Sequence, residues 1–192
     1  MDGEEPATEI EALIQRLRLH QPPPSPHAGD PSTAATPNAG ELLKPRRAAV
    51  LICLFRGSAG ELRVILTKRS SSLTTHSGEV ALPGGKVDEG DADDAATALR
   101  EAKEEIGMDP CLVTVVTSLE HFLSKHLLVV VPIVGILSDI EGFKPVPNIH
   151  EVDDIFDVPL EMFLKFQFIL QMISLRHTKK QKKGYCMNYH TT

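Results

Sequence analysis

The chain has 192 residues, 42% of them hydrophobic, and a formal net charge of −6, which suits one domain of ordinary size with a packed core. The charge argues against general nucleic-acid binding, and no apolar run approaches the ~20 residues needed to cross a bilayer. Three cysteines without a metal-binding spacing indicate unpaired thiols in a reducing compartment. The acidic first residues lack the features of transit and signal peptides, so we expect a cytoplasmic protein.

Two short segments precede the main domain. Apolar side chains recur at helical spacing after a capping-box pattern at Thr8 and Glu11, which predicts an amphipathic helix within residues 1–20. Residues 21–44 form a proline-rich stretch that is typical of a linker. We therefore expect the main domain to cover residues 45–165.

Strand patterns and one strong helix pattern alternate in the main domain. Apolar runs predict strands at 48–55, 62–68, 112–116 and 127–137. Acidic residues in a first turn and Gly107 at the end predict a helix over about 93–106, and Pro159 predicts the first position of a helix that starts at Leu160. This order predicts an α/β fold with a mixed sheet between helices.

The predicted central helix carries the most informative side chains. Glu101, Glu104 and Glu105 follow the spacing i, i+3 and i+4, which places them on one helical face. Three like charges there repel each other unless divalent cations lie among them, and such oxygen ligands suit Mg²⁺ or Mn²⁺. The preceding Gly84-Gly85 turn allows backbone to approach a metal ion and a phosphate closely.

The run from Pro83 to Met108 resembles the box of the Nudix hydrolases: Gly, five residues, Glu, seven residues, then Arg-Glu-apolar-x-Glu-Glu-x-Gly-apolar. The match is complete over 100–108, with the small Ala102 in the apolar slot. One extra residue separates the turn from the helix, and Asp91 stands where a Glu is expected. Three features resemble sequences of the coenzyme A diphosphatase branch. They are this departure in spacing, the preceding Leu-Thr-Lys-Arg-Ser segment and a later Asn-Ile-His-Glu-Val segment.

The resemblance implies a Nudix α/β/α sandwich that cleaves a diphosphate with Mg²⁺ or Mn²⁺. It makes Glu101 and Glu105 the main metal ligands and Glu104 an auxiliary ligand, and Arg100 would orient a carboxylate by a bidentate bond. The general base would be a glutamate of the box or a later loop glutamate. Glu151 is the natural candidate, with a plain loop carboxylate as the alternative interpretation.

The expected reaction is hydrolysis of coenzyme A or an acyl derivative to 3′,5′-ADP and the 4′-phosphopantetheine portion. NADH, ADP-ribose and oxidised nucleotides are the alternative substrates, and a poorly active variant that binds nucleotide or a partner is the alternative function. Lys68 or Arg69 would contact the substrate phosphates, or else be solvated charges at a strand end. The residues do not separate these alternatives, nor do they indicate an oligomeric state.

The resemblance ends near residue 166. Residues 166–192 are first apolar and then basic, and no acidic residue follows Glu161. We interpret this break as a variant C-terminus, such as translated intron sequence, in place of the family's final strand and closing helix. A membrane-surface or nuclear-targeting tail is the alternative. We therefore expect a chain that is less stable and less soluble than relatives with those elements, with reduced or no turnover despite an intact box.

Overall fold

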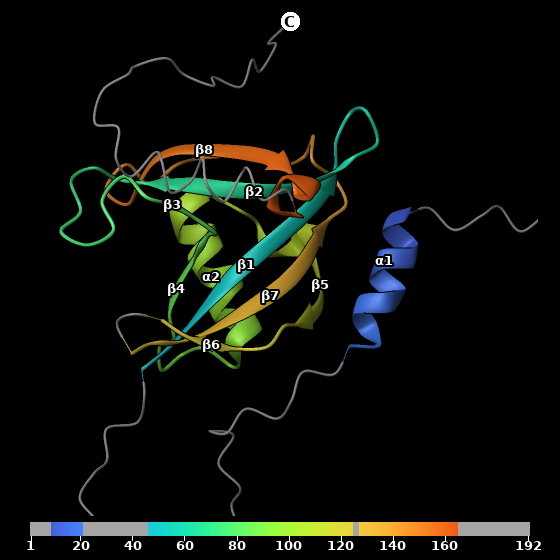
Figure 1. Cartoon of the computed structure of the whole chain (residues 1–192). Coiled ribbons are helices and arrows are strands. Elements are labelled where there is room, and N and C mark those ends of the chain that lie inside the picture. The colour runs from blue at the N-terminus through green and yellow to red at the C-terminus, as the bar shows by residue number, and fades with distance from the viewer. Residues whose placement is uncertain (1–8, 21–45, 125–126, 165–192) are drawn as a thin grey trace, which may run out of the picture.

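The computed structural model describes residues 9–20, 46–124 and 127–164 (Figure 1). In chain order its elements are α1 (Glu9–Arg18), β1 (Arg47–Arg56), β2 (Leu62–Arg69), β3 (Val80–Ala81), β4 (Gly84–Lys86), α2 (Asp94–Ile106), the 3-10 turn η1 (Pro110–Leu112), β5 (Val113–Ser118), β6 (Phe122–Leu123), β7 (Val129–Leu137), β8 (Val152–Pro159) and the 3-10 turn η2 (Leu160–Leu164). The predicted linker and the atypical basic tail, expected in place of the family's closing elements, lie outside the described residues.

The strands form one mixed sheet, as the sequence predicts. Five of them lie in the order β3-β2-β1-β7-β5, while β4 pairs with β1, β6 with β7 and β8 with β2. The central pair, β1 and β7, is parallel, and the other pairs are antiparallel. Every residue of β7 is buried, and a continuous apolar run suits a strand that is covered on both faces.

Helix α2 covers one face of this sheet and crosses behind β1 and β7 in Figure 1. Ala98, Ala102 and Ile106 on α2 are fully buried against alternate residues of β1, among them Leu51 and Cys53. Small alanines allow the helix to approach the sheet closely, so that polar side chains beside them on α2 come near the strands as well. The fold is therefore an α/β sandwich with its core between α2 and the sheet.

The amphipathic helix expected near the N-terminus is α1, and it packs on the opposite face of the sheet. Its apolar residues Ile10, Leu13, Ile14 and Leu17 contact a second core cluster that includes Leu54, Val64, Val134 and Ile136. The hydroxyl of Thr117 donates a hydrogen bond of 3.5 Å to the carbonyl of His20 just after the helix. Among the described residues, no helix combines the length and the apolar character that a membrane crossing requires.

The segment before Leu160, for which the sequence patterns predicted no strand, joins the sheet as β8. Pro159 is the last residue of β8, opposite Arg63 of β2, and Leu160 begins a 3-10 turn instead of an α-helix. A helix thus starts at Leu160 as predicted, but it is a 3-10 helix, and Pro159 belongs to β8 rather than to its first position. Within the described residues β8 pairs with β2, so proline at its last residue removes no ladder hydrogen bond on the other side.

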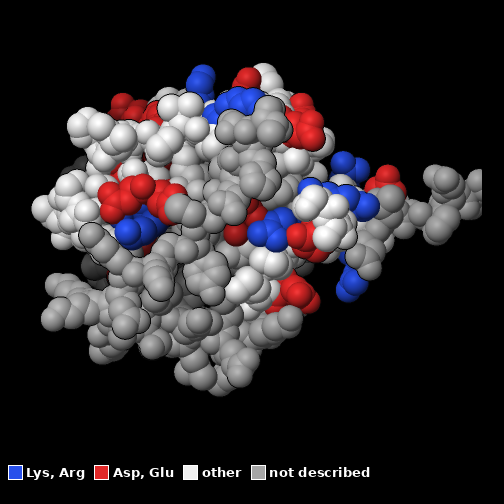
Figure 2. Space-filling model, turned by 90° about the horizontal axis from the view of Figure 1, so that it is seen from above, with Lys and Arg blue, Asp and Glu red and all other residues white. Residues whose placement is uncertain are grey.

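Charged side chains of β2 pair with those of β8. Arg63 contacts Asp157 and lies 2.8 Å from Glu61, and Lys68 lies 3.8 Å from Asp153. Figure 2 shows acidic and basic side chains beside one another in small groups over the visible face. Lys68 therefore belongs to an ion pair at this edge of the sheet, in agreement with its interpretation as a strand-end charge.

Two features of the backbone place α2 and the loop after it. Asp93 caps the helix through a 2.7 Å bond from the amide of Ala96, and Gly107 ends it with φ at +71°. The loop that leads to β8 is then tied to the last turn, because the amide of Asn148 donates a hydrogen bond of 2.9 Å to the carbonyl of Glu105. This tie brings the loop glutamate Glu151 to the carboxylates of α2.

Candidate active site

Glu105 lies in the last turn of α2 but points into the protein, with 3% of its side chain exposed. The amide of Gly84 donates a hydrogen bond of 3.1 Å to its Oε2, and Nη1 of Arg69 lies 3.5 Å from its Oε1. Burial raises the pKa of Glu105 from 4.5 to about 7, the Gly84 bond and Arg69 oppose that rise, and the charges of Glu101 and Glu151 add to it. Arg69 and the Gly84 amide therefore offset the burial of this carboxylate only in part.

Glu101 lies one turn earlier on α2, and 16% of its side chain is exposed. Burial raises its pKa above the ordinary value, Arg100 opposes the rise, and Glu104 and Glu151 add to it. The Glu101 carboxylate lies against Gly85, where any Cβ atom would collide with it. Glycine at this position is therefore what allows β4 and this carboxylate to approach each other.

The glycine turn expected at Gly84-Gly85 is part of the short strand β4, which pairs with β1. Arg100 joins these glycines, the loop and the helix. Its Nε and Nη2 donate hydrogen bonds of 2.9 and 3.0 Å to the two carboxylate oxygens of Asp91, and Nη2 also donates one of 2.9 Å to the carbonyl of Lys86. Its Nη1 donates a hydrogen bond of 3.1 Å to Oε1 of Glu101. The bidentate bond expected of Arg100 is thus present, and its partner is Asp91.

Asp91 is a site residue whose role the sequence did not reveal. Besides the two bonds from Arg100, it accepts one from the amide of Asp88 at 2.9 Å and one from the hydroxyl of Thr97 at 2.8 Å. The Arg100 guanidinium and these donors hold the pKa of Asp91 well below its usual range. The spacing of the box marked the position, but how the longer loop folds back onto α2 is tertiary information.

The remaining two predicted acidic residues lie in different surroundings. Glu104 is 55% exposed at its side chain, and its Oε2 lies 3.2 Å from Nη1 of Arg100. Glu151 is partly buried, accepts a hydrogen bond of 3.2 Å from Nδ2 of Asn148, and acts through its charge on the pKa of Glu101 and of Glu105. The structure therefore brings Glu151 to the two buried carboxylates and leaves Glu104 facing solvent.

The chemistry of these side chains fits a divalent cation. In the described part of the chain, no three His, Cys, Asp or Glu side chains form a complete metal site by themselves. A complete protein cage is not required, because Mg²⁺ is usually held by one or two carboxylates together with water and substrate phosphate oxygens. Glu101 and Glu105 supply two oxygen donors. Burial raises the pKa of both, and the neighbouring Arg100 and Arg69 offset that rise only in part.

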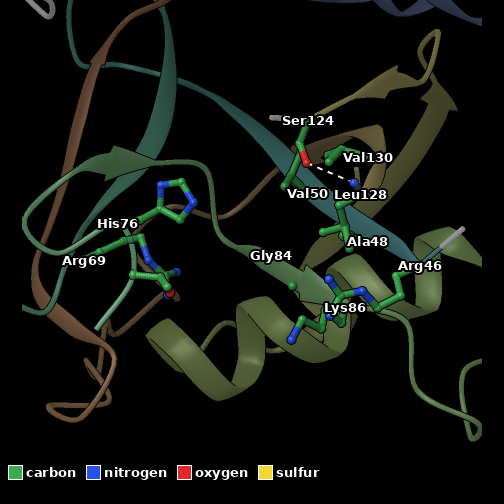
Figure 3. Close-up of a pocket in the computed structure, with 12 residues that line it drawn as sticks. Arg46, Ala48, Val50, Arg69, His76, Gly84, Lys86, Ser124, Leu128 and Val130 are labelled. Atoms are coloured by element: carbon green, nitrogen blue, oxygen red, sulfur yellow. Dashed lines mark hydrogen bonds between the residues drawn. The ribbon is translucent and has the colours of Figure 1, made fainter. Parts of the chain in front are cut away.

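A cavity of about 580 Å³ opens beside the glycine turn (Figure 3). Gly84 and Gly85 belong both to its wall and to the contacts of the α2 carboxylates. Apolar side chains of β1 and of the start of β7 line it, together with the cationic side chains of Arg69, Arg46 and Lys86. Arg69, expected either at phosphates or in solvent, thus lies between Glu105 and the cavity.

With this geometry in view, comparison with known proteins identifies the family. The family model for the NUDIX domain matches residues 45–169. The chain belongs to the Nudix hydrolase family. The members of that family hydrolyse acid anhydrides, and the matched region of this Nudix chain contains every predicted site residue.

Curated relatives agree with that assignment. The chain is 70% identical over 122 residues to "Nudix hydrolase 15, mitochondrial" of Arabidopsis thaliana, which covers 64% of this chain and 43% of the relative. It is 52% identical over 174 residues to "Nudix hydrolase 22, chloroplastic" of the same plant, with 80% and 56% covered. It is 42% identical over 129 residues to "Peroxisomal coenzyme A diphosphatase NUDT7" of Mus musculus, with 67% and 53% covered. The chain therefore spans about half the length of these relatives.

Solved structures show the same fold. The binary complex of a C. elegans Ap4A hydrolase aligns with a TM-score of 0.52 at 24% identity, over 68% of this chain and 92% of that one. The M. smegmatis Nudix hydrolase RenU aligns with a TM-score of 0.53 at 20% identity, over 69% and 84%. At these identities the likeness extends to the fold alone.

Proposed function

We propose that this Nudix domain hydrolyses the diphosphate bond of coenzyme A or an acyl-coenzyme A, with Mg²⁺ or Mn²⁺ as its cofactor. The products would be 3′,5′-ADP and the (acyl-)4′-phosphopantetheine. The observation that carries the proposal is that two desolvated carboxylates, Glu101 and Glu105, touch the glycine turn from one side while a cation-lined cavity opens on it. The choice of coenzyme A is supported by the name of the mouse relative, a coenzyme A diphosphatase.

In this proposal Glu101 and Glu105 hold the cation, and Glu104 serves as an auxiliary ligand. A bound divalent cation supplies the neutralisation of phosphate charge and lowers the pKa of water. Arg100 fixes Glu101 directly and the glycine turn through the carbonyl of Lys86. These bonds hold the carboxylate and the turn in one geometry throughout the reaction.

Glu151 is the proposed general base, which takes the proton of the attacking water. Its Asn148 bond orients the carboxylate, and its charge already acts on both buried glutamates. The matched test is Glu151→Gln, which keeps the hydrogen-bonding shape and removes the base. A loss of kcat on the order of 10²-fold or more is expected, whereas unchanged kcat would leave Glu151 as a plain loop carboxylate.

NADH, ADP-ribose and oxidised nucleotides share the diphosphate linkage and remain the alternative substrates, and a binding domain with little turnover is the alternative function. The deciding experiment incubates the 192-residue chain with each compound in Mg²⁺, in Mn²⁺ and in chelator, and separates the products by chromatography. We expect 3′,5′-ADP from coenzyme A in the presence of a cation only. Faster cleavage of another substrate would replace the substrate assignment, and full turnover in chelator would contradict the cation's role.

The cytoplasmic location stays a prediction from the sequence. It is checked by the distribution of the tagged chain between cell fractions, where we expect the soluble cytoplasmic fraction. Recovery from an organelle fraction would overturn the predicted location and would leave the proposed reaction unaffected.

A further inference from the structure

The cavity beside the glycine turn has a charge that the whole chain does not have. The chain contains 26 acidic and 20 basic residues. Among the described residues, however, the cavity is lined by three cationic side chains, Arg46, Arg69 and Lys86, and by no Asp or Glu. A cavity with charges of one sign and low-dielectric walls concentrates ligands of the opposite charge. Its lining therefore indicates an anionic ligand.

The three cations fall into two groups. Arg69 faces Glu105 at 3.5 Å. Within the described ranges, the side chains of Arg46 and Lys86 make no ion pair or hydrogen bond, and both are exposed to solvent. Figure 3 shows Arg46 and Lys86 together on one side of Gly84 and Arg69 on the other. Positive charge is thus available at two separate places in one cavity.

The sheet register brings Arg46 and Lys86 together. Lys86 on β4 lies opposite Ala48 on β1. Arg46 comes two residues before Ala48, and residues two apart in an extended chain point to the same face. The backbone on both sides is fixed, because the amide of Val129 donates a hydrogen bond of 3.0 Å to the carbonyl of Arg46, and the amide of Val87 donates one of 3.1 Å to that of Arg47.

We infer that Arg46 and Lys86 form a second anion subsite, which binds a phosphate group that the substrate carries in addition to the diphosphate to be cleaved. The inference rests on the proposed function, because in coenzyme A this group is the 3′-phosphate of the ribose. Guanidinium and ammonium groups are the ordinary partners of phosphate. The nucleoside lies over the apolar wall of β1 and β7, and a cavity of about 580 Å³ is of the usual size for such a ligand.

The subsite is tested by calorimetric binding of 3′,5′-ADP and 5′-AMP in chelator, since these two ligands differ only in the 3′-phosphate. We expect the wild-type chain to bind 3′,5′-ADP at least about tenfold more tightly, the gain of one charge-assisted contact. Arg46→Gln and Lys86→Gln should each bring that ratio towards one and leave 5′-AMP binding unchanged. Arg56→Gln, an exposed cation at the far end of β1, is the matched control and should keep the wild-type ratio.

Equal affinity of the wild-type chain for the two ligands would overturn the inference, and so would a ratio that survives in both variants. A third ligand, 2′,5′-ADP, separates the two positions a ribose phosphate can occupy. Tighter binding of 2′,5′-ADP would overturn the assignment to a 3′-phosphate. A wild-type chain that shows the expected ratio but does not cleave coenzyme A would support the subsite and contradict the proposed hydrolysis, so the two failures are distinguishable.

Discussion

Asp91 and Glu105 both carry carboxylates that solvent scarcely reaches, with 5% and 3% of their side chains exposed. Asp91 accepts four hydrogen bonds, two of them from Arg100, and its pKa is held below the usual range. Glu105 accepts one hydrogen bond, from the amide of Gly84, has Arg69 at 3.5 Å, and has its pKa raised to about 7. Desolvation is the largest influence on the pKa of Glu105, whereas hydrogen bonds from Arg100 and Asp88 outweigh it at Asp91.

In the proposed function, this difference separates a residue that positions other side chains, Asp91, from a residue that would hold the cation, Glu105. Asp91 uses its charge inside the protein, where it fixes Arg100 and through it the glycine turn and Glu101. The charge of Glu105 is disfavoured by burial and offset only in part by Arg69 and the Gly84 amide, and in the proposed function a cation would complete its compensation. Deep burial of a carboxylate is therefore not by itself a sign of a ligand. The balance between desolvation and the hydrogen bonds received is more informative.

The largest expected effect is on turnover in Glu105→Gln. The substitution removes the charge at nearly constant shape, so diphosphate hydrolysis should fall on the order of 10²-fold or more. The free energy of unfolding at pH 8 in chelator should not fall, because a neutral amide is cheaper to bury than a carboxylate whose ionisation is disfavoured. Steady-state kinetics and urea unfolding measure the two. Wild-type turnover in this variant would remove Glu105 from the site.

The raised pKa of Glu105 predicts the direction of a pH effect on stability in chelator. A folded-state pKa of about 7 against an ordinary 4.5 gives stability that is complete below 4.5 and is lost as the pH rises through 7. At about 1.4 kcal/mol per pKa unit, the loss is on the order of 3 kcal/mol. Urea unfolding of the wild type and of Glu105→Gln at several pH values isolates this contribution as their difference. A difference that is constant with pH would contradict the burial of an ionisable Glu105.

Asp91→Asn should weaken the hydrogen-bond network that positions Arg100. It removes the charge that holds Arg100, so the glycine turn and Glu101 lose their common support. We expect hydrolysis to fall about 10- to 100-fold, the usual effect of losing a residue that orients a ligand. In contrast to Glu105→Gln, the melting temperature should also fall. A loss of activity with no loss of thermal stability would mean that Asp91 acts in binding instead.

The smallest effect is expected for Glu104→Gln. The Glu104 side chain is 55% exposed, and its Oε2 lies 3.2 Å from Nη1 of Arg100. Water therefore already screens its charge. Turnover should fall less than about tenfold, since an auxiliary ligand contributes less than a buried one. A loss as large as that of Glu105→Gln would show that Glu104 turns inward and binds the cation as a main ligand.

The regular elements of the main domain were predictable because each depends on local signals. The four predicted strands, which are β1, β2, β5 and β7, and the helix α2 begin and end within two residues of the predicted positions, since alternation, an acidic first turn and Gly107 act over short distances. No strand was predicted at the positions of β3, β4, β6 and β8. The spacing of the box placed Glu101, Glu104 and Glu105 on one face of α2, whereas the structure turns Glu101 and Glu105 towards β4 and leaves Glu104 exposed. The family resemblance further predicted the α/β/α sandwich architecture, and the NUDIX domain match confirms the Nudix fold.

What the sequence did not reveal depends on contacts between distant parts of the chain. Glu104 and Glu105 are neighbours, and only the position of β4, 20 residues earlier, buries one and exposes the other. Pro159 is typical of a helix start, but pairing with Arg63 on β2 makes it the end of a strand. The Arg46 and Lys86 pair depends likewise on the register of β1 with β4.

The central claim is that the buried carboxylate of Glu105 is a main ligand of the divalent cation. Manganese binding followed by electron paramagnetic resonance tests it. The titration compares the wild type, Glu105→Gln and the exposed control Glu104→Gln at pH 8, where Glu105 is ionised. We predict a bound ion in the wild type, an affinity at least about tenfold lower in Glu105→Gln, and a smaller change in Glu104→Gln. Equal affinity and stoichiometry in the wild type and in Glu105→Gln would contradict the account.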